Sequence, residues 1–131
     1  MMVIRSKLIQ SAVLAVLGGG AAVSSAHAGE VTFQNSLRAC VTITDVKIST
    51  QANLVLASTN IQMRKSIAEC RCLSAVANYT SSVDAGGVRD VLQSGSIVLL
   101  SGGAKTFVLA SDPTSVANKR VQVTLSCAGP L

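Results

Sequence analysis

Aromatic residues are scarce in this chain of 131 residues. It has no tryptophan, and its aromatic side chains are Phe33, Tyr79 and Phe107. Proteins that bind nucleobases, sugars or proline-rich peptides by stacking need an aromatic surface. The composition therefore argues against these modes of binding.

Histidine occurs once, as His27, in the N-terminal stretch MMVIRSKLIQSAVLAVLGGGAAVSSAHA. There Arg5 and Lys7 precede an apolar run, and Ala26-His27-Ala28 fits the small-x-small pattern of a cleavage site. The pattern predicts a secretory signal peptide over residues 1–28 that is cleaved after Ala28. No cysteine follows the apolar run, which argues against a lipid-anchored lipoprotein.

A single-pass membrane anchor is the alternative for this segment. Gln10, Ser11 and the glycines at 18–20 dilute its apolar core, which favours the signal peptide. The mature chain has no run that approaches the roughly 20 apolar residues of a membrane span. We therefore expect no membrane span in it.

Cleavage would remove the one histidine and leave Met63 as the one methionine. A chain without imidazole has neither Ser-His-Asp nor Cys-His activation of a nucleophile, and no histidine ligand for a metal. A methionine-rich copper site is excluded as well. No constellation of serine, lysine, tyrosine or carboxylate groups stands out, so we expect a protein that is not an enzyme and has no cofactor.

Residues 29–131 have the length of one small domain. Loss of Arg5 and Lys7 lowers the formal charge from +5 to +3. Adjacent basic residues occur only at 64–65 and 119–120, whereas a nucleic-acid interface needs a longer basic stripe. We therefore expect no binding to nucleic acid.

Short runs of β-branched and aliphatic residues, bounded by turn residues, dominate residues 29–131. In KRVQVTLSC (119–127), alternation puts Val121, Val123, Leu125 and Cys127 on one face, which predicts a strand with that face in the core. In ACVTITDVKIS (39–49) the alternation slips near Thr44-Asp45, which indicates a β-bulge or a bend. Further strands are expected at 53–58, 96–101 and 105–111.

Turn residues occur at 84–87, 94–95, 101–103 and 111–114. SIVLL-SGGAK-TFVLAS is expected to form a β-hairpin closed by a glycine loop. Helices over 61–69 and 88–93 are alternatives to extended structure there. Many short strands with regular turns predict an all-β fold, a small antiparallel β-sandwich with immunoglobulin-like general architecture.

The four cysteines are Cys40, Cys70, Cys72 and Cys127. In an exported protein this even number predicts two disulfides. On an extended strand, the Cβ atoms of residues 70 and 72 would lie roughly 6.5 to 7 Å apart, whereas a disulfide needs about 3.5 to 4.5 Å. The two cysteines should then have different partners, which leaves the pairings 40–70 with 72–127 and 40–72 with 70–127 open.

Two alternatives give Cys70 and Cys72 a chemical role. They could chelate a soft metal such as copper(I), or form a redox pair in which Arg71 helps to hold a thiolate. No histidine or methionine cluster supports the metal site. For the redox pair, the spacing is not Cys-x-x-Cys, and Glu69 opposes Arg71.

The stretches SIAECRCLSAVANYTSSV, SGSIVLLSGGAKTFVLASD and KRVQVTLSCAGP resemble an uncharacterised family of small exported bacterial proteins. Its members have a Glu-Cys-x-Cys-x-Ser-Ala block, an aliphatic strand pair and a Val-x-Val-x-Leu-Ser-Cys ending. The resemblance extends over most of the chain from the Cys40 region onward. It implies a location in the bacterial envelope and an all-β fold, and no particular activity.

Together these features predict a periplasmic or secreted bacterial protein that acts as a structural or protein-binding module, stabilised by two disulfides. Its expected partner is another envelope protein. A pilus-type subunit assembled by strand addition would need an exposed strand edge and a hydrophobic donor arm, and the arm available here, Val31-Thr32-Phe33, is short. A periplasmic copper-type or thiol-redox protein that uses Cys70 and Cys72 is the alternative.

Overall fold

A computed structural model describes residues 28–129 of the chain. The predicted signal peptide lies outside the described residues except for Ala28. The elements, in chain order, are β1 (Val31–Asn35), β2 (Val41–Gln51), β3 (Leu54–Met63), η3 (Ile67–Cys70), β4 (Val76–Ala85), β5 (Val88–Val98), β6 (Gly103–Ala110), η4 (Pro113–Ser115) and β7 (Val121–Cys127), where η denotes a short 3-10 helix.

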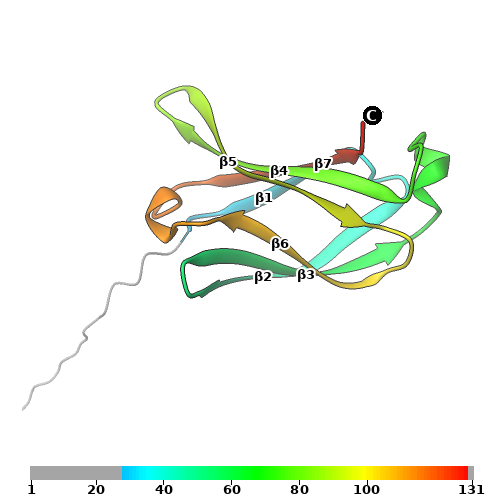
Figure 1. Ribbon diagram of the computed structural model, residues 1–131, viewed down its shortest axis with the longest axis horizontal. Coiled ribbons are helices and arrows are strands. Elements are labelled where there is room, and N and C mark those ends of the chain that lie inside the picture. Colours follow the sequence, from blue (N-terminus) through cyan, green and yellow to red (C-terminus); the bar gives the residue numbers. More distant parts are fainter. Residues whose placement is uncertain (1–27, 130–131) are drawn as a thin grey trace, which may run out of the picture.

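The strands form two sheets that pack face to face (Figure 1). One has four strands in the order β1-β7-β4-β5, and the other has three in the order β2-β3-β6. The predicted all-β sandwich is therefore confirmed. The strand pairs are antiparallel as expected, except that β1 runs parallel to β7.

The core lies between the sheets and is built from alternate residues of the strands. Val121, Val123 and Leu125 of β7 are completely buried, as their alternation predicts. In the centre, the ring of Phe107 makes edge-on contacts with Phe33 and Tyr79, at centroid distances of 5.4 and 5.0 Å. The few aromatic residues of the chain thus join β1, β4 and β6 in one cluster.

The expected β-hairpin of residues 96–111 is wrong. β5 belongs to the four-stranded sheet and β6 to the three-stranded sheet, and the two do not pair. The connection between them crosses from one sheet to the other. Leu99 is still bonded to the four-stranded sheet, donating its backbone N–H to Ala75 O at 2.7 Å. Gly102 already lies against β3 of the other sheet, where an added Cβ atom would be 2.6 Å from Ile61 O. The glycine loop in the sequence predicts that the chain turns here, but it does not predict which strand β6 pairs with.

The hairpin in the four-stranded sheet is instead β4–β5, whose turn lies at the predicted residues 84–87. Gly86 and Gly87 have φ values of 63° and 87°, and Asp84 Oδ1 accepts a hydrogen bond from Gly87 N at 3.0 Å. The alternative helix over 88–93 is wrong, because these residues form the first half of β5. The turn expected at 94–95 is also wrong, since Gly95 pairs with Tyr79 inside the sheet.

The predicted bulge in β2 is confirmed. The pairing with β3 shifts register between Thr44 and Lys47, and Asp45 has a φ of 55°. The alternative helix over 61–69 is wrong for most of its length, because Ile61 to Met63 belong to β3 and only a single 3-10 turn, η3, follows. Within residues 28–129 no helix has the length and hydrophobicity needed to cross a membrane.

Candidate functional site

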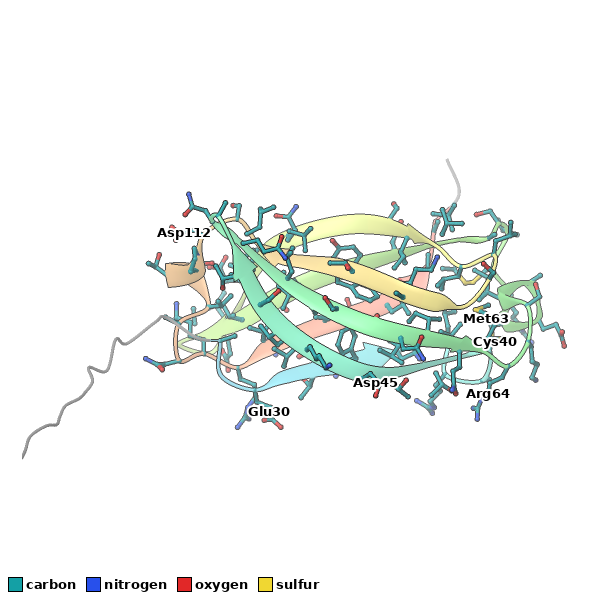
Figure 2. All side chains as sticks on the ribbon, turned by 90° about the horizontal axis from the view of Figure 1, so that it is seen from below. Glu30, Cys40, Asp45, Met63, Arg64 and Asp112 are labelled. Atoms are coloured by element: carbon teal, nitrogen blue, oxygen red, sulfur yellow. A yellow bond between two sulfur atoms is a disulfide. The ribbon has the colours of Figure 1, made fainter. Side chains whose placement is uncertain are left out.

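All four cysteines lie at one end of the sandwich, which we call the disulfide end. Figure 2 shows Cys40, Met63 and Arg64 at this end and Asp112 at the opposite one. Cys40 bonds to Cys70 and Cys72 bonds to Cys127, which is the first of the two pairings that the sequence leaves open.

The local conformation of residues 70–72 differs from the extended strand that we expected. Ser66 caps η3, its Oγ accepting a hydrogen bond from Ala68 N at 3.3 Å. Arg71 then adopts a left-handed conformation with a φ of 73°, and Cys72 N donates to Ile67 O at 3.1 Å. The two cysteines have different partners because the chain turns between them, and not because they are spaced along a strand.

The disulfides tie together segments far apart in sequence. Cys40 is fully buried after β1, and its carbonyl oxygen accepts hydrogen bonds from Arg64 N at 2.7 Å and Lys65 N at 3.2 Å. Arg64 Nη2 also donates to Arg38 O at 2.8 Å. The turn after β1, the segment after β3 and the end of β7 therefore form one cross-linked unit.

The disulfides determine what Cys70 and Cys72 can do. Residues 28–129 contain no free cysteine, and no group of three or more His, Cys, Asp or Glu side chains that could hold a metal ion. A bonded cysteine offers no thiolate to a metal or to an oxidant. A soft-metal or redox role would thus require that a disulfide first be reduced.

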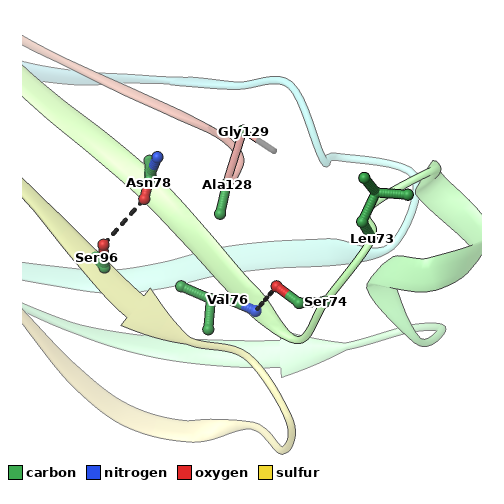
Figure 3. A pocket seen from close by; sticks show the side chains of 7 residues that line it. All are labelled: Leu73, Ser74, Val76, Asn78, Ser96, Ala128 and Gly129. Carbon is green, nitrogen blue, oxygen red and sulfur yellow. Dashed lines mark hydrogen bonds between the residues drawn. The ribbon is translucent and has the colours of Figure 1, made fainter. Parts of the chain in front are cut away.

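Beside the disulfides lies an open apolar groove of about 710 Å³ on the outer face of the four-stranded sheet. Figure 3 shows the residues that line it, which are Leu73, Ser74, Val76, Asn78, Ser96, Ala128 and Gly129. Ser96 Oγ donates a hydrogen bond to Asn78 Oδ1 at 2.9 Å, and Ser74 Oγ accepts one from Val76 N at 3.2 Å. These polar side chains bond within the groove wall and leave the wall mainly apolar.

Large apolar side chains lie in and beside this groove. Leu73 lines it, and Val98 pairs with the groove residue Val76. Leu100 lines a smaller pocket that shares Leu73 and Ser74 with the groove. Leu73 is 82% exposed, Leu100 is 78% exposed and Val98 is 53% exposed. Sequence reasoning missed all three as surface residues. The run Ile97-Val98-Leu99-Leu100 held a signal for two of them. A half-buried strand needs apolar residues only at alternate positions, so two of these four side chains must face solvent.

The predicted cleavage site lies at the opposite end. Ala28 forms an isolated bridge with Ala117, and Gly29 N donates to Lys119 O at 2.8 Å. A side chain at residue 29 would have its Cβ 2.8 Å from Lys119 O, so the close approach requires glycine. Nearby, Arg120 and Glu30 form an ion pair at 3.3 Å in which both side chains are exposed, and such pairs contribute little to stability.

A family model for an uncharacterised protein conserved in bacteria, DUF2195, matches residues 13–130. The chain belongs to this family. The match confirms the resemblance stated from its cysteine and strand motifs, and the DUF2195 description assigns no activity. No curated protein and no solved structure matches the chain significantly.

Proposed function

We propose that this DUF2195 protein is an exported, non-enzymatic module of the bacterial envelope that binds another protein through its disulfide end. The observation that carries the proposal is the exposure of Leu73, which lines the apolar groove, and of Leu100, which lines an adjoining pocket with Leu73. Single exposed apolar residues are common on protein surfaces, but clustered ones around a hollow are typical of interaction sites.

The two disulfides support this role by keeping the surface rigid. Leu73 directly follows Cys72, and Ala128 directly follows Cys127, so the Cys72–Cys127 bond joins two walls of the groove. A surface that is already ordered loses less conformational entropy when it binds. The disulfides would thus contribute to affinity as well as to stability.

Export is supported by the same bonds. Disulfides persist in the periplasm and outside the cell and are rare in the cytosol. The predicted cleavage after Ala28 falls at the margin of the sandwich, where Gly29 makes its hydrogen bond to Lys119 O. A mature protein that begins at Gly29 would keep every strand, because β1 starts at Val31.

The test is site-specific photo-cross-linking in the bacterial envelope, with the photoreactive residue at position 73. We expect a cross-linked product that Leu100→Asp weakens, because a charge in an apolar contact is costly to desolvate. Leu54→Asp is the matched control, since Leu54 is 41% exposed at the opposite end of the other sheet. Absence of any product at position 73, or equal loss in both variants, would refute the proposed function.

A further inference from the structure

We propose that β5 pairs with β5 of a second copy of this chain, so that the apolar grooves of the two copies join across a two-fold axis. This deepens the proposed function, because it makes the binding surface a property of the dimer. The observations are the hydrogen-bonding groups along β5, the lack of charge there and the position of Ser96.

The first observation is a free row of backbone groups. β5 is the last strand of its sheet and pairs only with β4 among residues 28–129. Leu99 N donates to Ala75 O at 2.7 Å, and the register continues unbroken from there to Gln93, which pairs with Ser81. Because direction alternates along an antiparallel ladder, the N–H and C=O groups of Ser94, Ser96 and Val98 point away from β4.

The second observation is that the part of this edge from Gln93 to Val98 lacks the usual protection. Natural proteins shield edge strands by keeping them short, or with bulges and charged side chains. Of the other edge strands, β1 has only five residues, and β2 has a bulge and carries Lys47. On β6 the backbone N–H of Val108 is already bonded to Tyr79 Oη at 3.0 Å. In contrast, no bulge interrupts β5 between Gln93 and Val98, and no charged residue occurs from 91 to 104.

The third observation is that this edge is complementary to itself. A two-fold axis perpendicular to the sheet at Ser96 would pair Ser96 with its own copy, and Ser94 with Val98 of the other copy. In each pair both residues present free N–H and C=O groups, so all groups of the row find partners. No like charges would meet, and the contact closes on itself as a two-fold dimer should.

The groove is the reason that this dimer matters for function. Ser96 lines the groove of its own copy and would lie on the axis. The two grooves would then meet at the paired Ser96 residues and form one trough, with a Leu73 wall contributed by each copy. Each copy thus completes the binding surface of the other, and a partner protein would contact both.

Sedimentation velocity of the disulfide-bonded protein tests the dimer. We expect twice the mass of one chain for the wild type. Ser96→Asp and Ser96→Lys should each weaken dimerisation at least about tenfold, because like charges would lie directly opposite across the axis. An equimolar mixture of the two variants should recover a dimer. Ser96→Ala, which also loses the bond to Asn78, and Ser58→Asp on an exposed position of β3 should both remain dimeric.

A wild-type protein with the mass of one chain would overturn the dimer, as would a dimer that persists in both charged variants. A photo-cross-link from position 73 to a different protein would then leave the proposed function standing for a single copy, because one chain already presents Leu73 and its own groove. Conversely, loss of that cross-link in a dimeric protein would refute the partner and leave the dimer in place.

Discussion

The hydroxyl of Tyr79 accepts a hydrogen bond from the backbone N–H of Val108 at 3.0 Å and thereby links the two sheets of the sandwich. Tyr79 belongs to β4 and Val108 to β6. The ring of Tyr79 also packs edge-on against Phe107 and covers Gly95 of β5. One buried side chain therefore connects three strands of the core.

Tyr79→Phe should destabilise the protein by about 1 to 3 kcal/mol, because the part-buried N–H of Val108 would lose its acceptor while the ring contacts remain. Urea unfolding measures this as a lower midpoint with an unchanged m-value. A midpoint equal to that of the wild type would mean that water replaces the hydroxyl.

Gly95→Ala should cost about 1 to 3 kcal/mol, because the interior cannot accommodate the added methyl group without strain. The new Cβ would lie 2.7 Å from Cε1 of Tyr79, and that ring is held by Phe107 and by the bond to Val108. Gly129→Ala is the matched control, since nothing lies within 4 Å of its Cβ position. Equal stability of the two variants in thermal unfolding would contradict the close packing at Gly95.

Serine substitutions of the cysteines should show that the two disulfides stabilise the protein independently of each other. The bonds join residues 30 and 55 positions apart, so each stabilises by about 3.5 to 4.5 kcal/mol in the chain-entropy model. Replacing Cys70 or Cys72 alone should therefore impair accumulation as much as replacing Cys40 or Cys127.

Double variants make this test sharper. Cys40→Ser with Cys70→Ser removes one bond and should accumulate like the single variants, whereas Cys40→Ser with Cys72→Ser removes both and should scarcely accumulate. Stable Cys70 and Cys72 variants that lose only resistance to metal or oxidant stress would contradict the structural role and favour the chemical one.

Acid should weaken the cap of η4. The carboxylate of Asp112 accepts a hydrogen bond from the backbone N–H of Thr114 at 3.0 Å and another from the Thr114 hydroxyl at 2.9 Å. These two bonds, the backbone one first, lower the pKa of Asp112. The folded protein thus favours the charged form of Asp112. The stability that this cap contributes is present above the unfolded pKa of about 4 and is lost as the pH falls through the lower folded pKa.

Asp112→Asn keeps an acceptor at the cap but does not titrate. In thermal melts from neutral to acidic pH, the wild type should therefore lose more stability than this variant. Parallel curves for the two proteins would show that the cap does not contribute to the acid sensitivity.

The sequence was most informative where a strand has one buried face. Alternation placed Val121, Val123 and Leu125 in the core, and its slip at Thr44-Asp45 located the bulge. Both features follow from local geometry, since side chains alternate along a strand whatever its partner is.

Features that depend on tertiary partners were not predictable. SIVLL-SGGAK-TFVLAS has the local pattern of a hairpin, yet its strands lie in different sheets, where β5 pairs with β4 and β6 pairs with β3. Likewise, Ser94-Gly95 has the composition of a turn, but Gly95 lies within β5 where the Tyr79 ring packs against it. The groove could not be predicted for the same reason, because it is lined by residues near 73, 96 and 128, which are far apart in the sequence.

We predict that Glu69-Cys70-Arg71-Cys72 braces the disulfide end and carries out no chemistry of its own. Tryptic mapping of the exported protein, alkylated before any reduction and digested at mildly acidic pH to limit thiol exchange, tests it directly, because cleavage after Arg71 separates the two cysteines. We predict that peptide 39–47 is linked to 66–71, that peptide 72–89 is linked to the peptide starting at Val121, and that no metal accompanies the protein. Alkylated Cys70 and Cys72, or copper or zinc in the same sample, would contradict the account and make this stretch the site itself.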